Sequence, residues 1–345
     1  MSYGNLNVDT VTTSTTGGVL GAGNASIMKN RIINGAMVID QRNAGASVTP
    51  APSGYTLDRW NSVNTQSSKL SVQQNAGSVT PPTGFANYLG VTSLSAYTVG
   101  TSEQFSILQY IEGYNIADLA WGTANAKTVT LSFWAYSSLT GTFGGVLRNN
   151  SGTQASYPFS YSIPVANTWT QISITVAGST SGTWLTTNGQ GLAVSFSMGT
   201  GATLSGTAGT WSSNYYASAT GATSVVGTSG ATFYITGVQL EVGSSATGFE
   251  YVNYQTSLAN CQRYYQGIVL GLSYSTPAGS AGGNVAYPVY MRASPTATIV
   301  TAPNYVNASA YVVNAATNAQ SLSFTWSSAG SGYLTGGLTT VSAEL

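Results

Sequence analysis

Hydrophobic and polar residues alternate in several short segments of this chain. The clearest is residues 128–137, where the hydrophobic positions Val129, Leu131, Phe133 and Ala135 alternate with Thr130, Ser132, Trp134 and Tyr136. A period of two is typical of a β-strand that turns one face toward a core. The same alternation in residues 170–176 and 192–198 predicts two further half-buried strands.

Strand-like segments recur along most of the chain. Between about residues 55 and 250 they are separated by Gly, Ser and Thr turns at the spacing of a β-sandwich. Residues 200–230 are mostly Gly, Ala, Ser and Thr, and we expect a long excursion there in which no element can be placed. After residue 267 the strand pattern returns in residues 268–274, 285–291, 297–300 and 321–326.

The first 54 residues have a different character. Their Thr, Val and Gly residues favour strand or loop over helix. The pair Asn34-Gly35 lies between two hydrophobic runs and predicts a two-residue hairpin turn. Because a lone hairpin is marginal in water, we expect it to pack on another surface. The sequence therefore predicts an extended β-rich arm.

Residues 253–266 form the most helix-like segment. Hydrophobic residues recur there at intervals of three and four, as one face of a helix requires. We expect Arg263 to pair with an acid such as Glu250. The residues expected to pack inward are Leu258, Cys261 and Tyr265.

The length of 345 residues suggests about two domains with connectors. The chain is thus predicted to be all-β apart from one short connector helix. Its predicted parts are an N-terminal arm (1–54), a central sandwich (55–250), the connector (251–266) and a small C-terminal β domain (267–345).

Charge is sparse. Nine basic and nine acidic residues make up 5% of the chain, there is no histidine, and the formal net charge is zero. Soluble domains usually carry about 25% charged residues. Zero net charge removes the electrostatic attraction that dominates binding to nucleic acids and anionic membranes, so neither partner is predicted. A surface without net charge also does not keep copies apart, which favours a homo-oligomer.

The N-terminal residues and the uncharged segment predict neither secretion nor a membrane span. Residues 1–9 are polar, so no signal peptide is predicted. The charge-free stretch from Asn149 to Leu240 is broken every few residues by Gly, Ser, Thr and Asn, which argues against a membrane helix and against membrane insertion.

The residue types that carry catalysis are scarce. Serine catalysis needs a base that the histidine-free chain does not supply. A glycosidase needs two facing carboxylates about 5–9 Å apart. The one local cluster of acids in the central part is Glu103, Glu112 and Asp118, and we expect these to pair with arginine or to cap a helix in residues 102–120. No enzymatic activity is predicted.

Metal and redox chemistry are also not predicted. Cys261 is the only cysteine, which excludes an intrachain disulfide and a multi-cysteine zinc site. No Asp-x-Asp run suggests a calcium loop, although a structural ion bound mainly by carbonyl oxygens stays open. We expect Asp58, Arg59 and Glu241 to form buried or turn-stabilising pairs. No cofactor is predicted.

Glycan binding is the chemistry that this composition favours. A sugar site needs an aromatic platform and neutral hydrogen-bonding groups, and charge is optional. Trp134 and Tyr136 project from the non-core face of their predicted strand, and Trp184 and Trp211 lie in or near loops. The alternative is that these side chains pack between sheets or between subunits, which is the commoner environment of a single tryptophan.

Three segments resemble bacteriophage tail-fibre and related virion-appendage proteins. The first is residues 29–43 with Tyr55-Thr56-Leu57-Asp58-Arg59-Trp60, the second runs from Gly237-Val238-Gln239-Leu240-Glu241 to Cys261-Gln262-Arg263-Tyr264-Tyr265, and the third comprises residues 287–296 and the terminal Ala343-Glu344-Leu345. They occur in the order that such proteins show and together frame most of the chain.

The resemblance implies a homotrimeric virion protein whose central part is a jelly roll similar to carbohydrate-binding modules. Its N-terminal arm would attach to other virion proteins through Arg31, Asn34, Gly35 and Asp40, and its distal parts would bind a host-surface polysaccharide. It would be assembled in the bacterial cytoplasm and would reside in the virion. The alternatives are a purely structural capsid, collar or baseplate component and, second, a polysaccharide depolymerase.

Overall fold

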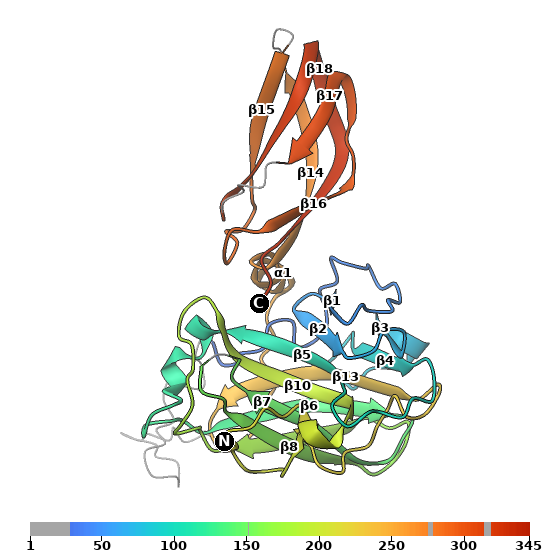
Figure 1. Cartoon of the computed structure of the whole chain (residues 1–345), viewed down its shortest axis with the longest axis vertical. Helices are drawn as coiled ribbons and strands as arrows, with labels where there is room; N and C mark the ends of the chain where they lie inside the picture. The colour runs from blue at the N-terminus through green and yellow to red at the C-terminus, as the bar shows by residue number, and fades with distance from the viewer. Residues whose placement is uncertain (1–27, 151, 275–278, 314–318) are drawn as a thin grey trace, which may run out of the picture.

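The computed structural model describes residues 28–150, 152–274, 279–313 and 319–345. Figure 1 shows a two-sheet sandwich and a narrower β domain that rises from one side of it, beside one short α-helix. The described residues are almost entirely strand, turn and loop. The prediction of an all-β protein with a short helix is confirmed.

The sandwich consists of a six-stranded and a five-stranded antiparallel sheet. The six-stranded sheet has the order β1-β2-β5-β10-β7-β8 and the five-stranded sheet the order β3-β4-β13-β6-β9. The strands of the first are β1 (Ser53–Leu57), β2 (Trp60–Asn64), β5 (Gln104–Glu112), β10 (Gln190–Thr200), β7 (Gly141–Arg148) and β8 (Ser156–Ile163). Those of the second are β3 (Leu70–Gln74), β4 (Leu89–Ser93), β13 (Thr232–Val242), β6 (Val129–Ser137) and β9 (Thr170–Val176).

The core lies between the two sheets. Phe133 of β6 makes edge-to-face contacts with Tyr161 of β8 and Phe196 of β10, at ring-centroid distances of 5.0 and 4.9 Å. The alternation in β6 predicted the inward direction of Phe133 correctly. Only β9 is half-buried as predicted; β6 and β10 are buried on both faces. The reason is that loops cover the outer faces of both sheets.

Residues 200–230 provide one of these covers. They contain the 3-10 turn η5 (Ala202–Leu204) and a two-residue parallel bridge between β11 (Ser205–Gly206) and β12 (Ser218–Ala219). The segment is hydrogen-bonded to β7 and β8, for example from Thr223 N–H to the Thr142 carbonyl at 2.7 Å. Val225 and Val226 are fully buried. This excursion is therefore part of the folded sandwich.

The predicted helix in residues 102–120 does not form. This segment is β5 followed by the 3-10 turns η3 (Gly113–Asn115) and η4 (Ala117–Leu119). A further 3-10 turn, η2 (Ala76–Ser78), follows β3. The hydrophobic residues of β5 face both the core and the covering loops, which favours a buried strand over an amphipathic helix.

The N-terminal arm lies mostly outside the described residues, and its described part corrects the hairpin prediction. Residues 28–52 form turns without a strand, and the turn at Asn34-Gly35 is present, with the Met37 N–H donating to the Asn34 carbonyl at 3.1 Å. Its flanks bond to the sandwich and form no strand ladder with each other within the described residues. The Arg31 N–H donates to the Leu240 carbonyl, and the Val238 N–H to the Gly35 carbonyl, both at 2.9 Å.

The helix and the C-terminal domain follow the sandwich. The Asn253 side chain accepts the Thr256 N–H at 2.9 Å and so caps helix α1 (Tyr254–Gln262). The described residues of the domain beyond it form five strands: β14 (Tyr265–Tyr274), β15 (Gly279–Ala286), β16 (Thr296–Thr301), β17 (Asn304–Val313) and β18 (Ser321–Ser342). Leu322, Phe324 and Trp326 of β18 point into a small core, as the alternation in residues 321–326 predicted.

Several elements of this domain differ from the prediction, and β18 runs to Ser342, well beyond the predicted residue 326. The segment 285–291 is a strand only to Ala286, and β17 was not predicted. Cys261 of α1 is buried, as expected, and this burial raises the pKa of its thiol. Leu258 and Tyr265 are only partly buried, and Tyr265 belongs to β14.

A cluster of charged and aromatic side chains, which we call the joint, connects the C-terminal domain to the sandwich. Glu344, from the end of the chain that Figure 1 marks beside α1, is only 7% exposed and forms ion pairs with Arg42 and Arg59. The Arg59 guanidinium lies 3.6 Å from the ring centroid of Tyr264 and donates to the Tyr110 carbonyl at 2.5 Å. Buried charges of opposite sign therefore hold the two parts together.

A second ion pair extends the joint. Arg263 forms a bidentate pair with Glu112, at 3.1 and 2.7 Å, and the Tyr264 hydroxyl donates to the same carboxylate at 2.8 Å. The prediction of Glu250 as the partner was wrong, because the turn after α1 directs Arg263 toward Glu112 of β5. Arg292 donates to the carbonyls of Ala343 and Glu344, at 2.8 and 3.0 Å.

Asp58 gives the joint a testable pH dependence. This carboxylate is 1% exposed and accepts the Gln41 backbone N–H and side-chain amide at 2.7 and 2.6 Å. Burial raises its pKa from 3.8 to about 6, while Arg42 and Gln41 partly oppose the rise. A raised pKa means that the neutral form fits the folded state better, so this group's stabilising contribution is complete below about pH 4 and is lost as the pH rises through 6.

We therefore expect the free energy of unfolding of the wild type, relative to Asp58→Asn, to fall between about pH 4 and pH 7. At about 1.4 kcal/mol for each pH unit, the fall is about 3 kcal/mol at most. Denaturant titrations of both proteins across this range measure it. Parallel pH profiles for the two proteins would contradict the expectation.

Candidate functional site

Trp134 differs from every other tryptophan of the sandwich. The others each donate the indole N–H to a backbone carbonyl, at 2.8 to 3.2 Å: Trp60, Trp121, Trp169, Trp184 and Trp211. Among the described residues the indole N–H of Trp134 has no partner. Trp134 is also the one residue of β6 that is not buried. Its ring and its donor are thus available at the surface.

The other three aromatic residues predicted as sugar platforms are packed in the protein. Trp184 and Trp211 contact Trp121 edge-to-face, with ring centroids 4.8 and 5.4 Å away, and belong to the main core cluster or pack against it. Tyr136 is 9% exposed and stacks on Tyr234 at 5.1 Å. The alternative reading of these residues, as packing side chains, is the one that the structure favours.

A groove lies over Trp134 on the outer face of the five-stranded sheet. Its volume is about 170 Å³. The β6 and β9 strands form the floor, and the walls are the segments around Phe85 and around Phe249 and Tyr251. Gly237, with φ of 61°, forms a bulge in β13, and a Cβ there would lie 2.6 Å from the Phe85 ring. Glycine at this position therefore lets Phe85 close the wall.

The chemistry of this groove is neutral. The side chains of Ser132 and Gln171 line it, and neither has a hydrogen-bond partner within the described ranges. The nearby Glu241 is 3% exposed and already accepts the Thr247 N–H and hydroxyl, at 2.8 and 2.6 Å. An aromatic face with free amide and hydroxyl groups suits a ligand with apolar faces and hydroxyls.

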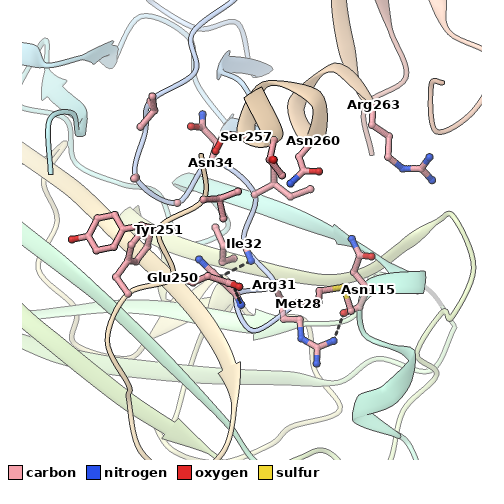
Figure 2. A pocket seen from close by; sticks show the side chains of 18 of the residues that line it. Met28, Arg31, Ile32, Asn34, Asn115, Glu250, Tyr251, Ser257, Asn260 and Arg263 are labelled. Carbon is pink, nitrogen blue, oxygen red and sulfur yellow. Dashed lines mark hydrogen bonds between the residues drawn. The ribbon is translucent and has the colours of Figure 1, made fainter. Parts of the chain in front are cut away.

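A larger cleft of about 430 Å³ lies beside α1 (Figure 2). Its walls come from residues 28–38, from residues 249–252 and from α1. Figure 2 shows the Arg31 side chain directed toward Asn115, whose carbonyl accepts from Arg31 at 2.6 Å. Arg31 also forms a bidentate pair with Asp118 at 2.5 and 2.7 Å, and hydrogen bonds from Arg31 lower the pKa of that carboxyl. The charges on this side are thus balanced.

Three of the four residues predicted to attach the arm to the virion meet at this cleft. Arg31, Asn34 and Gly35 line it, but Arg31 and Asn34 are only 6% and 9% exposed. Asp40 lies elsewhere and accepts the N–H groups of Asn43 and Gly45, at 2.9 and 2.7 Å. All four have structural roles within the chain, and their role in attachment stays a prediction.

The aromatic walls Phe85, Phe249 and Tyr251 were not predicted as site residues. Their rings form one cluster, with centroid distances of 5.1 to 5.8 Å. Sequence reasoning missed them because Phe85 is far from the other two along the chain. The Phe-x-Tyr pair at 249–251 is a weak pattern by itself, since it occurs in a connector that carries no alternation.

Two negative observations concern only the described residues. In these ranges no three His, Cys, Asp or Glu side chains form a group that could hold a metal ion. No helix there is long and apolar enough to span a membrane.

Comparisons with known proteins give structural similarities only. No family model matches the chain, and no curated protein matches it. Among solved structures, the enzymatically active domain of tailspike protein 4 of bacteriophage CBA120 has 14% identity and a TM-score of 0.34 over 62% of this chain. The chain covers 21% of that tailspike chain.

Two further structures come from sugar-binding proteins. A candidate sugar-binding protein from Bacteroides thetaiotaomicron has 11% identity and a TM-score of 0.37, over 62% of this chain and 100% of its own. A family 11 carbohydrate-binding module from Clostridium thermocellum, in complex with a mixed-linked tetrasaccharide, has 14% identity and a TM-score of 0.30, over 59% and 98%. Similarities at these identities and TM-scores do not assign a function to the chain.

Proposed function

We propose that this protein is a non-enzymatic structural component of a bacteriophage particle that binds host-surface polysaccharide in the groove over Trp134. The observation that carries the glycan-binding part is the state of Trp134. It is the one position of β6 that is not fully buried, and no described residue accepts a hydrogen bond from its indole N–H. A side chain that only packed would be expected to satisfy its donor, as the indole N–H groups of the other sandwich tryptophans do.

The virion part of the proposal is supported by the sequence segments that resemble tail-fibre and virion-appendage proteins. Much of that resemblance lies in residues that build the joint, including Asp58, Arg59, Arg263 and Glu344. The appendage is a homotrimer, bound to other virion proteins through residues 1–54, and is assembled in the bacterial cytoplasm. The sparse charge of the chain, with only Arg292 and Glu344 charged in residues 267–345, supports association between copies.

The variant Trp134→Ala tests glycan binding. Because stacking of one aromatic ring contributes on the order of 1 kcal/mol, we expect its affinity for polysaccharide to fall roughly five- to tenfold. Binding of purified protein to host cells and to a glycan array measures the change, and thermal unfolding checks the fold. Trp134→Phe is the matched control, since it keeps a ring and should retain most of the affinity.

Several outcomes would redirect the proposal. If wild-type protein binds no polysaccharide, a purely structural place in the virion is favoured, and imaging of labelled protein on intact particles would locate it. Shortening of host polysaccharide by the purified protein would indicate a depolymerase. If Trp134→Ala binds as tightly as wild type, the groove is not the glycan site.

A further inference from the structure

The groove over Trp134 and the cleft beside α1 share a wall. Phe249 and Tyr251 line both hollows, so the two lie on either side of the same short segment. Figure 2 shows Tyr251 at the edge of the cleft, across from Asn115. The groove and the cleft are therefore neighbours across residues 249–251.

Tyr251 has the properties of a platform. Its side chain is among the most exposed aromatic groups, at 63%. Its ring is nevertheless positioned, because Phe249 and Phe85 contact it at centroid distances of 5.1 and 5.8 Å. An exposed ring held by two others keeps its orientation without covering its outer face, which lowers the entropic cost of stacking against a ligand.

The far side of the cleft offers neutral hydrogen-bonding groups. Ser257 and Asn260 are three residues apart on α1 and so lie on one side of the helix. Figure 2 shows both directed toward the cleft, with Asn115 beyond them. Within the described ranges none of these three side chains has a hydrogen-bond partner, whereas Arg31 and Arg263 at the cleft are each paired with an acid. The lining therefore favours a neutral ligand over an anionic one.

The volumes of the groove and the cleft indicate how long a ligand each could hold. Ligand sites usually have volumes of about 300–1,000 Å³. The groove, at about 170 Å³, is below this range, and the cleft, at about 430 Å³, is within it. The groove alone thus has room for little more than one sugar ring, and the two together accommodate a longer chain than either does alone.

We infer that the groove and the cleft are consecutive parts of one extended site for a neutral oligosaccharide, with Trp134 and Tyr251 as two successive stacking platforms. This inference rests on the proposed glycan binding and adds to it the length and charge class of the ligand. Hydroxyls of the sugars beyond Tyr251 are bound by Asn115, Ser257 and Asn260.

An array of neutral bacterial oligosaccharides, each displayed at lengths of about two, four and six residues, tests this. Wild-type affinity should rise with length. Tyr251→Ala should lower affinity for the longest glycans roughly three- to tenfold and for the shortest much less, because Tyr251 is only a wall of the groove, whereas Trp134→Ala should weaken all lengths. Asn260→Ala should reduce only the increase in affinity with glycan length. Alanine has a higher helix propensity than asparagine, so this substitution should not disrupt α1. Tyr290→Ala is the matched control, because Tyr290 is equally exposed, at 65%, and lies in the C-terminal domain.

The outcomes separate the two proposals. Length-independent binding that is lost in Trp134→Ala but unaffected in Tyr251→Ala overturns the extended site and leaves the proposed function standing. Absence of binding to every glycan overturns both. A stronger response to anionic than to neutral glycans of equal length overturns the assigned ligand class.

Discussion

Replacing Glu344 with alanine is expected to lower the free energy of unfolding by about 3–5 kcal/mol, because it leaves a buried arginine without its counter-charge. Arg59 is 1% exposed, and Glu344 is its ion-pair partner. The same carboxylate pairs with Arg42 at 2.5 Å. Removing the Glu344 carboxylate therefore leaves two largely buried arginines without this ion-pair partner. Denaturant unfolding followed by tryptophan fluorescence measures the loss.

Two variants make this result specific. Glu344→Gln keeps an acceptor but loses the charge, so we expect an intermediate loss of stability. Lys127→Ala removes an ion pair with Asp118 in which both side chains are about half exposed, at 50% and 45%. Such a pair contributes at most about 1 kcal/mol. Equal losses in Glu344→Ala and Lys127→Ala would show that the joint is not held by its buried charges.

Phe133→Ala is expected to cost about 3–5 kcal/mol of unfolding free energy, through the lost burial and the cavity left between the sheets. Phe133 is 1% exposed and contacts the rings of Tyr161 and Phe196, which both belong to the facing six-stranded sheet. Calorimetric or denaturant unfolding measures the loss. The neighbouring variant Trp134→Ala should have a much smaller effect on stability while it weakens glycan binding.

Substitutions of Phe133 and Trp134 compare the inner and outer faces of β6 in their effects on stability and on glycan binding. Phe133→Leu retains part of the volume and should recover part of the stability. If Trp134→Ala unfolds the protein as readily as Phe133→Ala, then Trp134 is a packing residue and the groove does not bind glycans through it.

Sequence reasoning was most accurate where one strand carries its own pattern. The alternation in β6 correctly placed Phe133 inside and Trp134 outside, and that in β18 correctly placed Phe324 in the small core. It was inaccurate where burial depends on remote chain. β10 reads as half-buried, but residues 202–226 cover its outer side, and no local pattern shows where such a loop will lie.

In the candidate site too, the sequence predicted the residue on a patterned strand but not the residues whose position depends on loops or remote segments. Trp134 was identifiable because its strand fixes its direction, whereas Trp184 and Trp211 lie in loops whose direction the sequence does not determine. The cluster of Phe85, Phe249 and Tyr251 depends on two segments meeting across the sheet. The sequence likewise predicted that Arg263 pairs with an acid, but it did not identify Glu112 as that acid, because the two residues are distant in sequence.

The last strand of the C-terminal domain sets an order of events during biosynthesis. β14, β15, β16 and β17 each pair with β18, which follows all of them in the chain. While the ribosome is still making β18, these four strands have no ladder to join, although the sandwich upstream already has all its strands. Contacts of such long sequence separation form slowly. The C-terminal domain is thus built after the sandwich, and until then its strand edges are exposed to other newly made chains, including further copies translated from the same messenger RNA.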